Sequence, residues 1–192
     1  GLTASEIAEE LDMANSSVHD HLTTLLHKGY LIKSDHEYDI SLKFLDHGTY
    51  AKNKIRVSTV AQPILEQLAE ETGEAVWLIV EEHGQAVYID KGIGKNAVPT
   101  TGRIGHRTYL HYLSGGKCIL AEMDPDRLER IISRHGLPSQ TEQTISNESD
   151  LHTELETIRE QGFAFNDSEE VEGVRAVGSA IVCDDSVIGG IS

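Results

Sequence analysis

Ser114, Gly115 and Gly116 stand directly before Lys117, and residues of these types can bind an anion. We expect a helix to begin near Lys117, so that the two glycines expose backbone N–H groups at its N-terminus, where the helix dipole favours negative charge. The glycines could instead form a turn or end a helix without any ligand. The stretch is not a nucleotide-binding phosphate loop, because the GxxxxGK[ST] spacing fails and Cys118 occupies the Ser/Thr position. The pattern therefore predicts an anion cradle.

Motifs that would indicate catalysis do not occur in the sequence. There is no GxSxG or HExxH, and Gly92-Ile93-Gly94 lacks the rest of a dinucleotide-binding fingerprint. We predict that the protein is not an enzyme and needs no cofactor. An enzyme built on a sensor-like fold is an alternative, and it would require turnover of a bound ligand.

The ten histidines do not predict a metal site. His19 and His21 are two positions apart, so on a helix they face different directions. His106 and His111 have no acidic residue at ligand spacing. We predict surface or partly packed histidines and no metal.

Residues 3–41 predict two short helices followed by a hairpin. The first helix begins at Thr3 or Ser5, and the second, after a tight turn at 12–14, at Asn15 or Ser16, all residue types that cap helices. The second helix has apolar residues at helical spacing, Val18, Leu22, Leu25 and Leu26. With extended runs at 30–33 and 37–41 as a wing, this is the winged helix-turn-helix layout, whose second helix enters the major groove of DNA.

The second helix would turn short polar side chains outward if Val18, Leu22 and Leu25 face inward. Hydroxyl groups suit phosphate positioning and base contacts, and an aspartate can accept a hydrogen bond from cytosine. A solvated helix face without a partner is the alternative. The predicted DNA-binding residues are Asn15, Ser16, Ser17, His19, Asp20, His21, Thr23, Thr24 and Lys28.

Residues 42–60 form a basic segment, which we expect to be a helical linker interrupted near Gly48. Its four basic residues, against Asp46 alone, could bind phosphate and set the spacing of two readers on a two-fold site; they are Lys43, Lys52, Lys54 and Arg56. Solvation of an otherwise apolar linker is the alternative. Apolar residues that could pack against a partner chain are Leu42, Leu45, Ile55 and Val57.

Residues 61–192 alternate helices with hairpins. A helix with Pro63 in its first turn comes first, and hairpins are predicted at 75–90 and 174–191. Hairpins separated by helices indicate an α+β fold in which helices flank an antiparallel sheet. The glycines that end the predicted helices are Gly73, Gly136 and Gly162.

The charge balance is strongly acidic. The 192 residues hold 16 basic and 32 acidic side chains, a net charge of −16 spread over every segment. A spread acidic surface keeps a protein hydrated in concentrated salt, so we interpret the chain as halophilic. A mildly acidic protein from ordinary salt with no role in DNA binding is the alternative.

Other features of the composition predict a soluble, cytoplasmic protein. No apolar run is long enough for a membrane span, and the N-terminus has no targeting pattern. Cys118 and Cys183 stand in no CxxC or CxxH pattern, so we expect two buried thiols without a disulfide or a zinc site.

The first part of the chain resembles the reader domain of the IclR family, from its second helix through the wing. The resemblance is carried by the string GLTASEIAEELDMANSSVHDHLTTLLHKGYLIKSDHEYDISLKFLDHG. Members often have basic residues where this chain has Asn15 and Asp20. The resemblance also implies a helix before Thr3 and a further strand and helix after Ser192, so we expect the native protein to extend beyond both ends.

The larger domain resembles the IclR effector domain, whose fold is similar to the GAF and profilin-like sensor class. Three stretches carry this resemblance, and they are ILEQLAEETGEAVWLIVEEHGQAVYID, RIGHRTYLHYLSGGKCILAEM and IREQGFAFNDSEEVEGVRAVGSAIV followed by VIGGIS. Members often have Asp at the position of Asn166 and Cys at that of Ala176. By position, the resemblance implies effector contacts at Ser114, Gly115, Gly116, Asn166, Ala176 and Ser192. We expect a small organic acid as the effector.

Together these patterns predict three parts, namely a winged helix-turn-helix domain at 1–41 without its first helix, a helical linker at 42–60, and an effector-binding domain at 61–192 without its C-terminal end. We predict a homodimer or homotetramer that binds double-stranded operator DNA, with an affinity that the small-molecule effector changes. The alternative is a ligand-sensing or dimerisation module without DNA binding. It is favoured by the eight acidic residues of segment 1–41, which face only Lys28 and Lys33.

Overall fold

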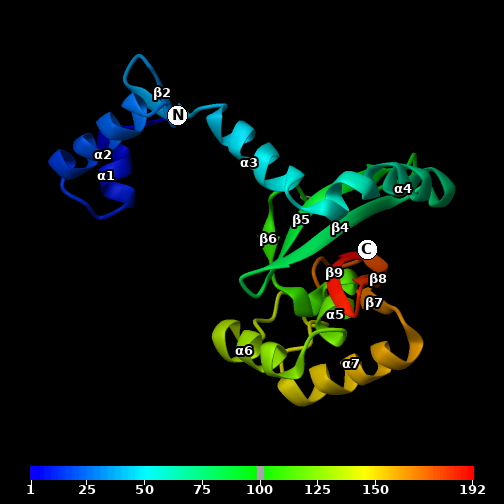
Figure 1. Ribbon diagram of the computed structural model, residues 1–192. Helices are drawn as coiled ribbons and strands as arrows, with labels where there is room; N and C mark the ends of the chain where they lie inside the picture. The colour runs from blue at the N-terminus through cyan, green and yellow to red at the C-terminus, as the bar shows by residue number, and fades with distance from the viewer. Residues whose placement is uncertain (99–101) are drawn as a thin grey trace. The chain divides into compact units, whose positions relative to one another are not determined.

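The computed structural model describes residues 1–98 and 102–192, which form two compact units, Gly1–Lys54 and Ile55–Ser192. Figure 1 traces the chain through both units, each of which is described by itself below. The division differs from the predicted three parts, because the segment at 42–60 is shared between the two units instead of standing apart.

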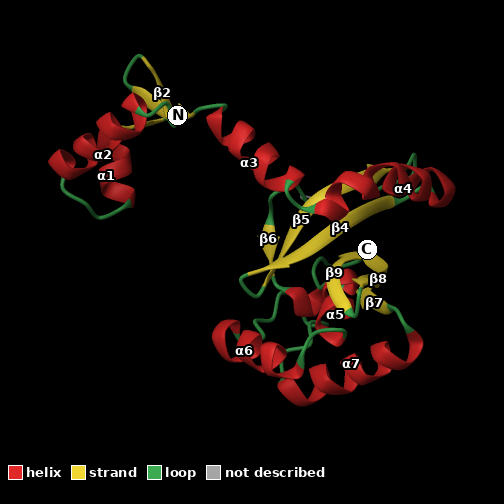
Figure 2. Ribbon diagram, in the orientation of Figure 1, coloured by secondary structure: helices red, strands yellow, loops and turns green. Residues whose placement is uncertain are grey.

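The N-terminal unit is a winged helix-turn-helix (Figure 2). After two helices, strand β3 pairs with both β2 and β1, so the antiparallel sheet has the order β1-β3-β2. The elements of this unit are β1 Leu2–Thr3, α1 Ala4–Glu10, α2 Asn15–His27, β2 Leu31–Ser34, β3 Glu37–Ile40 and α3 Lys43–Asn53.

The two reader helices start differently. Thr3 and Glu6 form a capping box, in which the Thr3 backbone N–H donates to Glu6 Oε2 at 2.7 Å and the Thr3 hydroxyl accepts from the Glu6 backbone N–H at 3.4 Å. Helix α2 begins at Asn15 after Ala14, whose methyl side chain cannot cap a helix. The prediction that Asn15 or Ser16 caps this helix was therefore wrong.

A small core holds the unit together. Ala8, Val18, Leu22 and Tyr38 are buried, and Leu26 packs against them. The prediction that Leu25 faces inward was wrong, since that side chain is 39% exposed. Leu26 follows Leu22 by four residues and so lies on the same helix face.

Helix α3 runs from Lys43 to Asn53 without a break, so the predicted interruption near Gly48 was wrong. A glycine inside a helix lowers stability but does not end the helix, and nothing lies within 4 Å of where its Cβ would be. The helical backbone is interrupted instead at Ile55, which has an extended backbone just before the next helix.

The C-terminal unit contains a six-stranded antiparallel sheet with the order β6-β5-β4-β9-β8-β7 in the described part of the chain. The hairpin of β8 and β9 therefore lies beside the hairpin of β4 and β5, because β9 pairs with β4. The elements are α4 Arg56–Thr72, β4 Ala75–Glu82, β5 Gln85–Ile93, β6 Arg107–Thr108, the 3-10 helix η1 Leu110–Tyr112, α5 Ser114–Ala121, α6 Pro125–His135, α7 Glu148–Gln161, β7 Ala164–Asp167, β8 Arg175–Cys183 and β9 Ser186–Ile191.

Helices cover both faces of this sheet (Figure 1). Leu78 and Ile89 pack with α4 on one face, whereas Ile79 and Tyr88 pack with α5, α6 and α7 on the other. This distribution follows the two-residue period of a strand. The predicted α+β architecture, an antiparallel sheet flanked by helices, is confirmed.

Two local predictions for this unit were wrong. Helix α4 begins at Arg56, so Pro63 lies in its interior instead of its first turn. Pro63 is exposed, and the Thr59 carbonyl that loses its helical donor can be hydrated. Of the two cysteines, Cys118 is buried as expected, but Cys183 is exposed.

Candidate functional site

In the N-terminal unit, α2 offers an exposed polar surface. Its inner side is held by Val18 and Leu22, which are 3% and 5% exposed. The nine residues predicted to contact DNA are all exposed: Asn15, Ser16, Ser17, His19, Asp20, His21, Thr23, Thr24 and Lys28. A helix anchored on one side and polar on the other can enter a DNA groove.

Two of the exposed hydroxyl groups on α2 are already engaged by their own helix. Thr23 Oγ1 donates to the His19 carbonyl at 2.8 Å, and Thr24 Oγ1 donates to the Asp20 carbonyl at 3.0 Å. In this arrangement the threonines can accept hydrogen bonds and offer methyl groups, while the donors left on this face include the Ser16 and Ser17 hydroxyls.

The lysines next to α2 are held against aromatic rings. Lys33 Nζ lies 4.7 Å from the centroid of the Tyr38 ring, and Lys43 Nζ lies 4.4 Å from that of Tyr30. Lys43 Nζ also donates to the Lys28 carbonyl at 2.7 Å, which ties α3 to the end of α2. These contacts fix positive charge beside an otherwise acidic reader.

In the C-terminal unit, the predicted anion cradle is the first turn of α5. The helix begins at Ser114, so the prediction that it begins near Lys117 was wrong. Close packing favours glycine at both positions: a Cβ on Gly116 would collide with the Leu110 carbonyl, and one on Gly115 would be in tight contact with the Ile191 carbonyl, at 3.0 Å. The first N–H groups of a helix have no acceptor within the helix, so this buried turn can donate to an anion.

Ser192 lies directly at this turn. Its hydroxyl oxygen is 2.6 Å from that of Ser114, and Ser114 is fully buried. The backbone of Ser192 pairs with that of Trp77, with N···O distances of 2.7 and 3.0 Å. The structure therefore brings together two of the predicted effector contacts and adds Trp77 on the neighbouring strand.

Asn166 and Ala176 face each other across β7 and β8. The Asn166 side chain is only 5% exposed; its amide nitrogen donates to the Tyr112 carbonyl at 2.5 Å, and its oxygen accepts from the Glu169 backbone N–H at 3.0 Å. Half of the hydrogen-bonding capacity of the amide is thus used to hold the protein itself.

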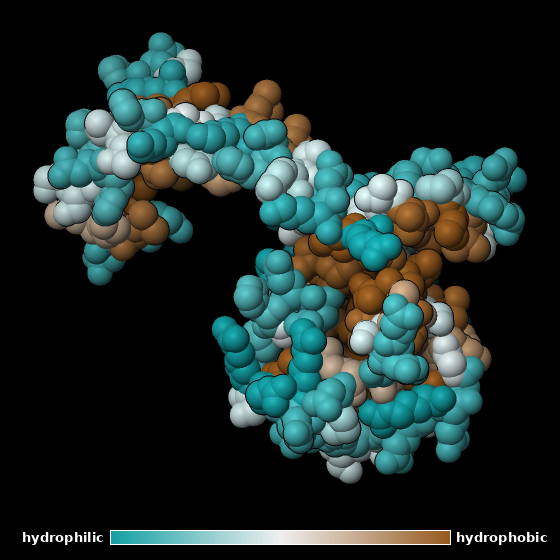
Figure 3. All heavy atoms as spheres, in the orientation of Figure 1, coloured by the Kyte–Doolittle hydropathy of each residue, from teal (hydrophilic) through white to brown (hydrophobic). Residues whose placement is uncertain are grey.

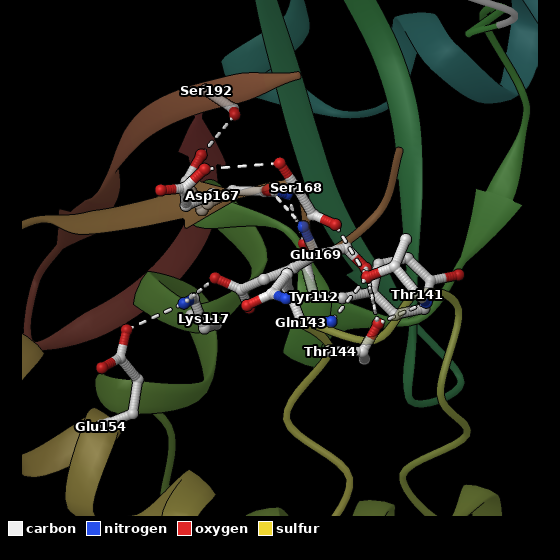
Figure 4. A network of polar contacts seen from close by, with 12 residues as sticks. Tyr112, Lys117, Thr141, Gln143, Thr144, Glu154, Asp167, Ser168, Glu169 and Ser192 are labelled. Atoms are coloured by element: carbon white, nitrogen blue, oxygen red, sulfur yellow. Dashed lines mark hydrogen bonds and ion pairs between the residues drawn. The ribbon is translucent and has the colours of Figure 1, made fainter. Parts of the chain in front are cut away.

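The loop after β7 is fixed by a network of polar contacts (Figure 4). Thr141 Oγ1 donates to the Ser168 carbonyl and Thr144 Oγ1 to the Glu169 carbonyl, both at 2.7 Å. Lys117 Nζ lies 2.8 Å from Glu169 Oε1. Burial raises the pKa of the Glu169 carboxyl, against the opposing effect of Lys117.

Sequence reasoning did not single out Trp77, Tyr88 or Glu170. The Trp77 and Tyr88 rings meet edge to face, with centroids 4.9 Å apart, and the Tyr88 hydroxyl donates to the Glu170 carboxylate at 3.2 Å. Burial raises the pKa of both Tyr88 and Glu170. Tyr88 and Glu170 are 82 residues apart, so no local spacing rule could pair them.

His111 is a packed histidine of the core and belongs to no group of possible metal ligands among the described residues. It is 3% exposed, Nε2 lies 3.1 Å from the Pro138 carbonyl, and burial lowers its pKa.

Within 1–98 and 102–192, no helix is long and apolar enough to cross a membrane.

Two family models match the chain. The model for the IclR helix-turn-helix domain matches residues 1–34, and the model for the C-terminal part of the bacterial transcriptional regulator IclR matches residues 49–192. The curated protein "Probable HTH-type transcriptional regulator ArcR" of Halobacterium salinarum is 29% identical over 185 residues, which is 94% of this chain and 70% of that protein.

Solved structures agree in fold. The crystal structure of Thermotoga maritima IclR is 30% identical, with a TM-score of 0.79 over 99% of this chain and 78% of that one. An IclR homolog from Microbacterium hydrocarbonoxydans, crystallised with 4-hydroxybenzoate, has a TM-score of 0.84 at 22% identity, over 98% of this chain and 79% of that one. Since the two family models together match most of the sequence, this chain belongs to the IclR family of helix-turn-helix transcriptional regulators.

Proposed function

We propose that the protein binds operator DNA through α2 and the β2–β3 wing, and that a small organic acid bound at the first turn of α5 changes this affinity. The observation that carries the effector site is the hydroxyl pair of buried Ser114 and half-buried Ser192, beside helix N–H groups that lack an intrahelical acceptor. A carboxylate satisfies several such donors at once. The homolog crystallised with 4-hydroxybenzoate, itself an acid, supports this class of ligand.

We infer that the regulator works as a homodimer or homotetramer on a two-fold operator. Exposed apolar side chains support pairing of two copies; the most exposed are Leu42, Ile40, Leu45 and Val60, at 83%, 69%, 66% and 65%. Figure 3 shows hydrophobic residues gathered along one side of α4 and over the strands next to it, whereas α6 and α7 present mainly hydrophilic ones. The effector can change DNA affinity only by preferring one arrangement of the two readers.

We further propose that the protein acts in the cytoplasm at high salt, with a domain of the GAF type as its sensor and no catalytic step. A net charge of −16 opposes DNA binding at low ionic strength, but screening shortens this repulsion to a few ångströms in concentrated salt.

The test of DNA reading is a fluorescence-anisotropy titration of the full-length protein against its own upstream DNA and a scrambled duplex, at roughly 0.2 M and 2 M KCl. We expect preference for the native duplex at the higher salt and loss of that preference in Ser17→Ala. No preference at either salt would favour the sensing module without DNA binding.

The test of the effector site is isothermal titration calorimetry with benzoate and 4-hydroxybenzoate, followed by the same DNA titration with the acid present. Ser114→Ala should weaken acid binding by about tenfold to hundredfold, as expected for one hydrogen bond to a charged group. Unchanged affinity in Ser114→Ala and in a Ser192→Ala variant would place the acid elsewhere.

A further inference from the structure

A series of contacts connects the first turn of α5 with the loop after β7. Ser114 contacts Ser192, whose backbone pairs with that of Trp77. The Trp77 ring contacts that of Tyr88, and the Tyr88 hydroxyl donates to Glu170. Glu170 follows Glu169, which is bound to Lys117, and Lys117 lies one helical turn after Ser114. The site therefore has hydrogen-bond donors at the start of α5 and carboxylates on the loop after β7.

On the carboxylate side of this site, acidic groups outnumber the basic group that faces them. Lys117 Nζ is 2.8 Å from both Glu154 Oε1 and Glu169 Oε1, so one lysine is shared by two acidic side chains. Glu170 adds a third acidic side chain. Glu169 is 8% exposed, and its Oε2 atom has no hydrogen-bond partner among the described residues. Figure 4 shows Glu169 between Lys117 and the strand end that carries Asp167.

Glu170 is also incompletely satisfied. Both of its oxygens lie 3.2 Å from the same Tyr88 hydroxyl, which has a single proton to donate. A carboxylate has about four acceptor positions, and leaving them empty in a half-buried place is unfavourable. Burial raises the pKa of this carboxyl, and only the hydrogen bond from Tyr88 is found to oppose this effect among the described residues.

The aromatic residues beside Glu170 are suited to a cation. Tyr88 is stacked on His106, with ring centroids 6.2 Å apart, and its other neighbour is Trp77. The Trp77 ring already holds a cation, since Lys91 Nζ lies 5.0 Å from its centroid. Aromatic faces and a carboxylate together bind ammonium groups better than either does alone.

We propose that the effector is a zwitterion, a small carboxylic acid that also carries an ammonium group, and that the ammonium group binds Glu170 beside Tyr88. The carboxylate binds the first turn of α5, so this inference rests on the proposed effector site. An ammonium group supplies both the missing hydrogen-bond donors and the missing positive charge, whereas a hydroxyl supplies only one donor.

The experiment is calorimetric titration of the full-length protein with three matched series of probes. They are β-alanine and 5-aminopentanoate, the corresponding hydroxy acids, and the corresponding unsubstituted acids. We expect the best amino acid to bind at least about tenfold more tightly than its unsubstituted partner, the effect of one charged hydrogen bond. Glu170→Gln should abolish this preference, so that within this variant the amino acid binds no more tightly than its unsubstituted partner.

Two further variants make the test specific. Glu170→Asp keeps the charge and should retain part of the preference, which a general loss of folding would not do. Glu172→Gln removes the same charge from the same loop, but Glu172 is exposed and lines a polar hollow with Thr141 and Asp167, so it should behave like the unmodified protein.

The outcomes separate this inference from the proposed function. Equal binding of amino and unsubstituted acids, or tighter binding of the hydroxy acids, would overturn the zwitterion and leave the acid site standing. Binding of none of the acids would overturn both. Preference for the amino acid that survives Glu170→Gln would also contradict the assignment, because the ammonium group would then bind another residue.

Discussion

Lys117 Nζ lies 2.8 Å from Glu169 Oε1 in a place where the lysine side chain is only 2% exposed and the glutamate side chain 10%. The same ammonium group is 2.8 Å from Glu154 on α7. One side chain thus connects α5, α7 and the loop after β7. A buried charge of this kind is tolerated only while its partners remain.

Removing the ammonium group should be costly for stability. Lys117→Met leaves Glu169 buried without its cation, and we expect a loss of about 3–5 kcal/mol in the free energy of unfolding. Urea unfolding measures this loss. Lys117→Met combined with Glu169→Gln should lose clearly less, and Lys95→Met, at an exposed position, should lose little. A loss below about 1 kcal/mol in Lys117→Met would mean that the pair is not buried in solution.

Gly178 allows β8 to approach the first turn of α5. A Cβ at this position would lie 2.7 Å from the Ile191 carbonyl oxygen and also 2.7 Å from the Ser114 carbonyl carbon, both backbone atoms that cannot move aside easily. Gly178→Ala should therefore destabilise the protein by about 1–3 kcal/mol and weaken acid binding.

Gly48→Ala is the matched control for Gly178→Ala, since nothing lies within 4 Å of its Cβ position in the middle of α3. There we expect a gain of about 0.5–1 kcal/mol. Thermal unfolding compares the two, and a stable, acid-binding Gly178→Ala protein would show that the close approach is unnecessary.

Glu170 should make stability depend on pH. Burial raises the pKa of its carboxyl in the folded state above the unfolded value. The protonated form therefore favours folding: this contribution is fully present below the unfolded pKa and is lost as the pH rises through the folded pKa. Glu170→Gln removes the ionisation, so the variant should have a higher Tm than the unmodified protein at pH 8, and the difference should shrink toward pH 4. A variant that is less stable at pH 8 would indicate a stabilising partner for this carboxylate.

Asp20 places a negative charge on the exposed face of α2. Replacing it with Ala should strengthen binding to native and scrambled duplexes alike at roughly 0.2 M KCl, and by much less at roughly 2 M, because salt screens repulsion from phosphate. Anisotropy titrations over a range of salt give this dependence. Loss of affinity for the native duplex alone would mean instead that Asp20 accepts a hydrogen bond from a base.

Much of the local structure was readable from the sequence because its causes are local. The capping box of Thr3 and Glu6 needs residues three apart. Helix α6 is opened by Asp124, which accepts from the Arg127 backbone N–H, and is ended by Gly136. The β4–β5 hairpin turns at His83 and Gly84, both with positive φ. Each of these signals acts over a few residues and is independent of the rest of the fold.

The tertiary structure alone decided where α5 starts and what surrounds the site. Glycine is a poor helix former, yet Gly115 and Gly116 lie in the first turn of α5, where the Leu110 backbone leaves no room for a side chain on Gly116 and the Ile191 carbonyl leaves little on Gly115. Lys117 and Glu169 are 52 residues apart, and Tyr88 and Glu170 are 82 apart. The sequence by itself determined the family and the fold class, and it predicted an anion cradle at residues that form the first turn of α5. Only the tertiary structure decided that Glu169 and Glu170 lie near Lys117 and Tyr88, because burial and pairing of residues far apart in the sequence depend on packing that no local pattern contains.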